Sequence, residues 1–220
     1  TQPCSSAASD VYKRQDVNIM QFGLGGLGLP DRDYYLKDDA SSVGLRTAYV
    51  AMMTALFAAA GDADPESLAA QVMELETRLA GTHWDRALRR NPEITYNKLS
   101  RSEFVAMAGG FPVETMLEGM GLAEEQTFLA SLVPPTAEEL AEAKISKEDA
   151  QKLGSGFPGA FLIAQEAELD AWKAWLRVHF LIDHADTLPA AFDEAVFAMY
   201  GTALRGQDQQ RPRWKRAVGA

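Results

Sequence analysis

The sequence predicts a mainly α-helical domain, an irregular assembly of several helices with one short extended segment near its start. Apolar residues recur at spacings of three and four in several stretches, which is the period of one helix face. Glycine and proline separate these stretches, and no segment repeats at a fixed period. The chain has 220 residues, of which 47% are hydrophobic and 24% charged, so a sizeable core is expected.

The first expected element is an extended segment, Asp16–Phe22, in which Val17 and Ile19 share one face. The next residues, Gly23–Gly28, match the G-x-G-x-x-G pattern of dinucleotide-binding loops. In those loops a helix opens on the last glycine, but Pro30 interrupts such a helix here and no strand–helix–strand unit follows. We therefore expect a tight loop packed through its backbone rather than a nucleotide site.

Two amphipathic helices are expected next. The first covers Gly44–Ala60 and is ended by Gly61, and the second begins at Pro65 with Asp64 as its N-cap. The apolar face of the second helix consists of Leu68, Val72, Leu75 and Leu79. Two later helix starts are marked by capping boxes, Ser100 with Glu103 and, after a Pro-Pro break, Thr136 with Glu139.

The longest helix is expected at Ala160–Ala185, after a glycine-rich break at Gly154–Gly159. A further helix is expected to start at Pro189 and to run to Gly201. The long helix carries enough apolar side chains that we expect it to be buried on more than one side: Leu162, Leu169, Trp172, Trp175, Leu176, Val178, Phe180 and Ile182.

The charge is strongly acidic and unevenly spread. A net charge of -10 disfavours nucleic acid as a partner. Glu114–Asp149 contains nine acidic residues and two lysines, whereas Arg205–Arg216 contains five basic residues and one aspartate. The simpler interpretation is that the acidic segment forms a solvated face and the basic segment a connector. The alternative is that the basic segment contacts an acidic surface in sequence outside this chain.

Cysteine usage and hydropathy add two further expectations. Cys4 is the only cysteine, so no disulfide can form within the chain. We expect no membrane span, because a span needs about 20 apolar residues and Ala160–His184 is interrupted by several charges.

Histidines are the strongest candidates for chemistry, and their spacing argues against it. His179 and His184 are five residues apart, which separates their side chains by about 140° around a helix, against about 40° for the four-residue spacing of a zinc-binding helix. We expect them to interact with the carbonyl end of the helix and with Asp183 or Asp186. His83 is expected to cap or pack. No catalytic, cofactor-binding or metal-binding residue is assigned.

Several ordered motifs resemble the neprilysin-like zinc metallopeptidases, which include the endothelin-converting enzymes and bacterial oligopeptidase O. The strongest motif is Gly28-Leu29-Pro30-Asp31-Arg32-Asp33-Tyr34-Tyr35, in which the two tyrosines are suited to anchoring a loop against a helix. The supporting motifs are Tyr49, Leu75-Glu76 with Leu79-Ala80, Tyr96-Asn97, Phe197-Ala198-Met199-Tyr200-Gly201 and Arg213-Trp214-Lys215-Arg216.

The resemblance implies that residues 16–220 form the central part of the family's N-terminal helical domain, which covers a zinc-containing catalytic domain and limits substrate size. Residues 1–15 match no landmark and are interpreted as a non-family leader or artefact. The zinc ligands and the family's His-Glu-x-x-His motif are expected in a parent protein, so that this fragment binds no zinc and is inactive alone. Its implied partners are peptide substrates of the parent and the catalytic domain.

Extracellular animal members of the family are rich in disulfides, so the single cysteine is more similar to a bacterial relative, and a periplasmic or otherwise exported protein is the leading expectation. The alternative function is a stand-alone, non-catalytic helical module that binds a peptide or protein. A metal enzyme using His179 and His184 ranks last.

Overall fold

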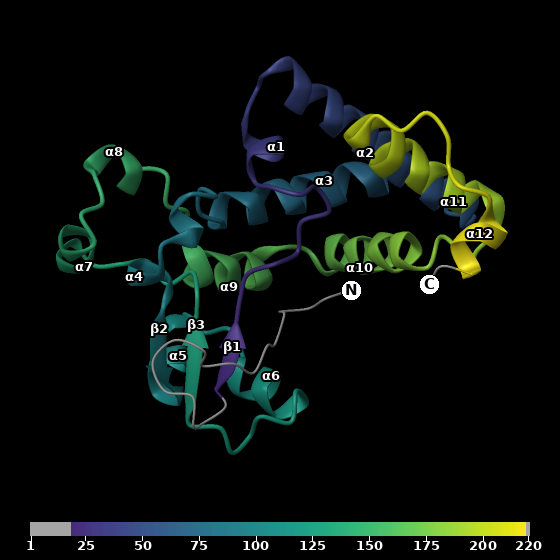
Figure 1. Ribbon diagram of the computed structural model, residues 1–220. Helices are drawn as coiled ribbons and strands as arrows, with labels where there is room; N and C mark the ends of the chain where they lie inside the picture. Colours follow the sequence, from purple (N-terminus) through teal and green to yellow (C-terminus); the bar gives the residue numbers. More distant parts are fainter. Residues whose placement is uncertain (1–18, 219–220) are drawn as a thin grey trace. The chain divides into compact units, whose positions relative to one another are not determined.

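The computed structural model describes residues 19–218, which form two compact units. The first unit comprises residues 28–77 and 168–218, and the second comprises residues 19–27 and 78–167. Both units are mainly helical (Figure 1), so the predicted fold class is confirmed. The expected leader, residues 1–15, lies outside the described residues.

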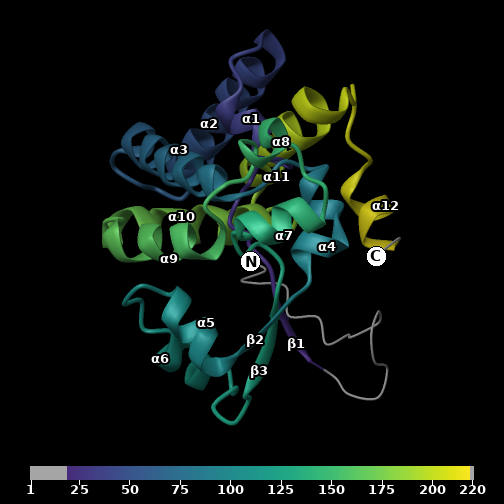
Figure 2. The ribbon, with the colours of Figure 1, turned by 90° about the vertical axis from the view of Figure 1, so that its left-hand side faces the viewer.

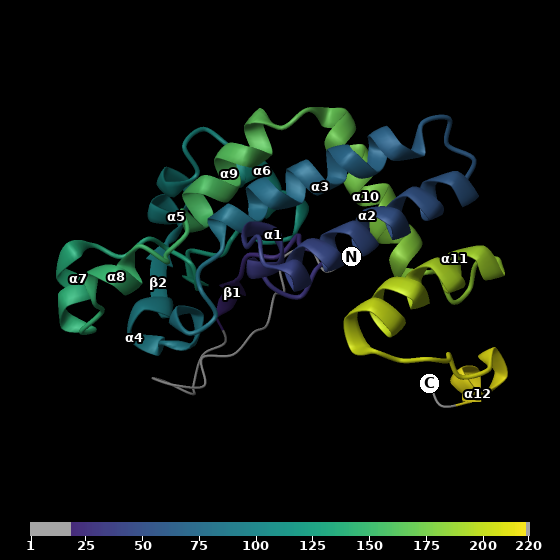
Figure 3. The same cartoon turned by 90° about the horizontal axis from the view of Figure 1, so that it is seen from above.

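The first unit is built around a long helix, α2, along which α11 and η2 pack (Figure 3). Its elements are α1 (Asp33–Leu36), α2 (Ala40–Ala59), the part of α3 (Pro65–Thr82) up to Thr77, α10 (Leu169–Asp183), α11 (Ala190–Val196), the π-helical η2 (Phe197–Ala203) and α12 (Arg213–Val218).

Helix α2 begins four residues before the predicted start because its N-cap is Asp39. The Asp39 side chain accepts hydrogen bonds from the backbone N–H groups of Ser41 and Ser42, which have no partner within the helix. The buried position in the first turn of α2 is a serine, Ser42, so the apolar periodicity of the helix begins only at Leu45. The buried face consists of Ser42, Leu45, Tyr49, Met52, Met53, Leu56 and Phe57.

The second unit contains a three-stranded sheet that the sequence did not reveal. Strand β3 (Thr127–Ala130) lies in the centre, parallel to β1 (Met20–Phe22) and antiparallel to β2 (Asn97–Ser100), as Figure 1 shows. Figure 2 shows the same strands from the side. The predicted extended segment is confirmed where the structure describes it, from residue 19 onward.

The second unit has an aromatic core. The rings of Phe22, Phe104 and Phe128 lie 4.9–5.5 Å apart, and the fully buried Trp84 donates its indole N–H to the Gly154 carbonyl. The elements are η1 (Leu88–Arg90), α4 (Pro92–Thr95), α5 (Arg101–Met107), α6 (Val113–Gly119), α7 (Ala137–Glu142), α8 (Lys147–Ala150) and α9 (Gly156–Glu166), with the end of α3. Of these helices, α7 and α8 contribute no buried residue to the core. Both predicted capping boxes are confirmed, at the starts of α5 and α7.

The predicted long helix at Ala160–Ala185 is wrong. Residues Ala167 and Glu168 adopt extended backbone angles, so that α9 ends at Glu166 and α10 begins at Leu169. The chain passes from one unit to the other at this point. The expectation of burial on several sides is also wrong, because Leu162, Leu169, Leu176 and Phe180 are each more than half exposed.

One described helix, α2, is long and apolar enough to cross a membrane, with a hydropathy of 1.3. Core helices of globular proteins meet the same criterion, and α2 buries one whole face within the first unit. The expectation of no membrane span remains a prediction.

Candidate functional site

A fully buried carboxylate, that of Glu76, occupies the middle of the first unit. Its side chain is 0% exposed and projects from α3 beside the apolar residue Leu75. Burying an ionisable group without partners costs several kcal/mol, so such a residue is found where hydrogen-bond donors converge. The surroundings of Glu76 are therefore the first place to look for a function.

Four donors converge on the two oxygens of Glu76. Oε2 accepts from the Tyr35 hydroxyl at 2.5 Å and from the Gly28 backbone N–H at 3.1 Å. Oε1 accepts from the Tyr49 hydroxyl at 3.1 Å and from His179 Nε2 at 2.8 Å. A carboxylate has about four acceptor positions, so this set satisfies Glu76. Because a carboxylate only accepts, Nε2 of His179 carries a hydrogen in this contact.

The donors come from segments that are far apart in the sequence. Gly28 lies in the loop before α1, Tyr35 in α1, Tyr49 in α2 and His179 in α10. Helix η2 joins the network through Tyr200, whose hydroxyl donates to the Gly28 carbonyl at 2.9 Å. One buried side chain thus connects most of the elements of the first unit.

Gly28 is required by close packing at the centre of this network. A Cβ atom added to Gly28 would lie 1.8 Å from the Tyr49 hydroxyl oxygen, far inside van der Waals contact. The expected backbone-packed loop is confirmed at this residue. The predicted anchoring role of Tyr35 is also confirmed, since its hydroxyl accepts from the Leu29 N–H at 2.8 Å while donating to Glu76 on α3.

The tyrosines are held in their protonated form. Burial raises the pKa of Tyr35 and Tyr49 far above the usual range, and the negative charge of Glu76 raises both further. Burial and the Glu76 charge raise the pKa of Tyr200 in the same way. The three hydroxyls therefore remain hydrogen-bond donors at physiological pH and are unsuited to proton transfer. The arrangement is a structural one.

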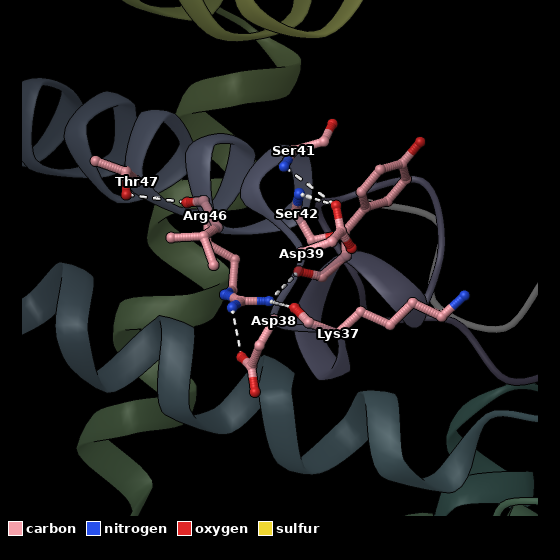
Figure 4. Close-up of polar contacts among 9 residues, drawn as sticks. Lys37, Asp38, Asp39, Ser41, Ser42, Arg46 and Thr47 are labelled. Atoms are coloured by element: carbon pink, nitrogen blue, oxygen red, sulfur yellow. Dashed lines mark hydrogen bonds and ion pairs between the residues drawn. The ribbon is translucent and has the colours of Figure 1, made fainter.

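A second polar cluster fixes α1 against α2 (Figure 4). The guanidinium of Arg46 donates to the carbonyls of Tyr34 and Lys37, at 2.8 and 2.6 Å, and pairs with Asp38 at 3.1 Å. These carbonyls lie at the end of α1, where helical partners are missing. Arg46 thereby holds the short helix that carries Tyr35.

The histidines do not meet, and one differs from its prediction. His184 Nδ1 interacts with the Phe180 carbonyl at 2.9 Å, as expected for the end of a helix. His179 instead pairs with Glu76 and packs against the Trp175 ring at 4.4 Å, so the expected contact with the helix end is wrong for this residue. His83 Nε2 lies 3.2 Å from the Gly25 carbonyl, in agreement with a packing role.

The residues that the structure describes do not offer a zinc site. Within residues 19–218, no three His, Cys, Asp or Glu side chains gather as metal ligands, and Glu76 with His179 supplies only two. The oxygens of Glu76 are already satisfied by His179, by Tyr35 and Tyr49 and by the Gly28 N–H. The absence of assigned catalytic, cofactor-binding and metal-binding residues stays a prediction.

Glu76 lies in one of the motifs of the sequence, Leu75-Glu76, but no local pattern marks it as the centre of the site. The available signal was its position one residue after Leu75 and four after Val72, within the apolar face of the predicted helix. A charged residue there is more often at the edge of the buried face than inside it. Its donors lie 27 to 103 residues away along the chain, which no local pattern reveals.

Comparison with known proteins gives the class of this chain. A family model described as peptidase family M13 matches residues 5–220. The chain therefore belongs to peptidase family M13, and the matched region is its N-terminal domain. Endothelin-converting enzyme 1 from Rattus norvegicus and from Homo sapiens are each 33% identical over 99 residues. Those residues make up 44% of this chain and 13% of the relatives.

Solved structures show the same fold. The zinc metalloprotease Zmp1 of Mycobacterium tuberculosis in its open state superimposes with a TM-score of 0.71 and 23% identity. The same metalloprotease in complex with an inhibitor gives a TM-score of 0.69 and 24% identity. Both matches cover 92% of this chain but only 28% of the metalloprotease. The chain thus spans a small part of the length of its relatives.

Proposed function

We propose that this chain supplies the helical domain of a zinc metallopeptidase, and that this domain covers the active site and limits the size of substrates. The observation that carries the proposal is the family match across residues 5–220. The fold similarity to a zinc metalloprotease over 92% of the chain supports it. So does the lack of a three-ligand group within residues 19–218.

In this proposal the zinc ion is held by residues outside these 220. The bound ion would lower the pKa of a water molecule and polarise the peptide carbonyl. The present chain contributes shape rather than chemistry. Its partners are then the catalytic domain of the same protein and the peptides admitted beneath the cover. A periplasmic or otherwise exported site is part of the proposal and is supported by the family resemblance alone.

The Glu76 network suits a cover that selects by size. A wall can exclude large substrates only if it keeps its shape, and shape is maintained by buried groups whose hydrogen bonds are all satisfied. The network joins α1, α2, α3, α10 and the loop at Gly28 through a single carboxylate. We assign Glu76 a positioning role in the cover.

Helix α10 offers a surface for the catalytic domain. Leu169, Leu176 and Phe180 are each more than half exposed and are spaced by seven and four residues, so they share one face of the helix. In this proposal these three exposed side chains contact the catalytic domain.

The second candidate function is a stand-alone helical module that binds a peptide or a partner protein. The same exposed face of α10 favours it. The two candidates differ in what the gene encodes next to this segment. A His-Glu-x-x-His motif within a few hundred residues downstream supports the peptidase, and a natural stop codon after Ala220 would exclude it.

The covering role is tested on the whole protein. The expected result is cleavage of a quenched oligopeptide and no cleavage of a stably folded protein that displays the same peptide in an exposed loop. The control is an open metalloprotease of the thermolysin type, which cuts both. Equal cleavage of both substrates by the whole protein would contradict the covering role while leaving the peptidase assignment intact.

A further inference from the structure

We draw no further inference here: the strongest candidate, the apolar groove of about 230 Å³ that Ala48, Ala51 and Ala55 of α2 line together with Ala195 of α11 and Ala198 of η2, is a stripe of small residues, and nothing in the structure shows what covers it.

Discussion

Replacement of Glu76 by glutamine tests the central feature of the first unit. The substitution keeps the size of the side chain but converts one acceptor oxygen into an NH₂ donor. If that NH₂ group pointed toward Gly28, two N–H donors would face each other, and the backbone donor cannot be reversed. The amide must therefore direct its NH₂ toward Tyr49 and His179, where the hydroxyl can rotate and the imidazole can change tautomer.

The expected cost follows from the bonds that remain. A hydrogen bond to a charged group contributes about 1.5–3 kcal/mol and a neutral one about 0.5–1.5 kcal/mol. The hydrogen bonds from Tyr35 and Gly28 would each change from a bond to a charged acceptor into a weaker bond to a neutral one. In the bonds with Tyr49 and His179, donor and acceptor would have to exchange roles. We expect Glu76→Gln to lower the free energy of unfolding of the first unit by about 2–3 kcal/mol. Glu76→Ala, which leaves all four donors without an acceptor, should cost about 4 kcal/mol.

The assay is urea unfolding followed by tryptophan fluorescence in a Trp84→Phe background, so that the half-buried Trp172 and Trp175 of the first unit give the signal rather than the buried Trp84 of the second. Hydrogen exchange of the Gly28 amide gives a local readout, and we expect it to accelerate in Glu76→Gln. Glu74→Gln is the matched control, because Glu74 is exposed on the same helix. A free energy of unfolding for Glu76→Gln within about 0.5 kcal/mol of this control would refute the reasoning.

Three further predictions concern the same unit. Gly28→Ala should lower the free energy of unfolding by about 2–3 kcal/mol, because its Cβ would meet the Tyr49 hydroxyl. Gly44→Ala has open space around it and should stabilise α2 by about 0.5–1 kcal/mol. Equal effects of the two substitutions in chemical unfolding would contradict this reasoning. Arg46→Lys retains the charge but loses the guanidinium that donates to two carbonyls at once, so it should lower the free energy of unfolding by about 1 kcal/mol in the same assay. An unchanged free energy of unfolding would mean that Arg46 does not hold α1 in place. Asp39→Ala should lower the Tm at neutral pH. Hydrogen bonds from Ser42 lower the pKa of Asp39, so its stabilisation is present above the unfolded pKa of about 3.9 and is lost as the pH falls through the folded value. The Tm difference from the unaltered chain should therefore vanish in acid; a difference that persists at about pH 2 would argue against an ionised cap.

Elements with local signals could be predicted from the sequence. Asp64 before Pro65, the Ser100 and Thr136 capping boxes and the apolar faces of the first two long helices depend on residues within one or two turns. The tight glycine loop could also be predicted, because Pro30 excludes the helix that a nucleotide site requires.

Features that depend on contacts between residues far apart in the sequence could not be predicted. Strands β2 and β3 have four residues each, too short for an alternating pattern to stand out. The break between α9 and α10 falls on Ala167 and Glu168, which are both good helix formers, so helix propensity predicts a continuous helix there. The tertiary structure overrides this propensity. Glu76 is buried only because Gly28, Tyr35, Tyr49 and His179 reach it.

We propose that this chain is part of a zinc metallopeptidase whose zinc ligands lie outside these 220 residues. This proposal is tested most directly by measuring bound zinc and peptidase activity of the purified 220-residue chain, with a quenched oligopeptide that has a large apolar residue after the scissile bond. We predict substoichiometric zinc and no chelator-sensitive cleavage. One tightly bound zinc per chain, with zinc-dependent cleavage that is lost in His179→Ala, would contradict the account.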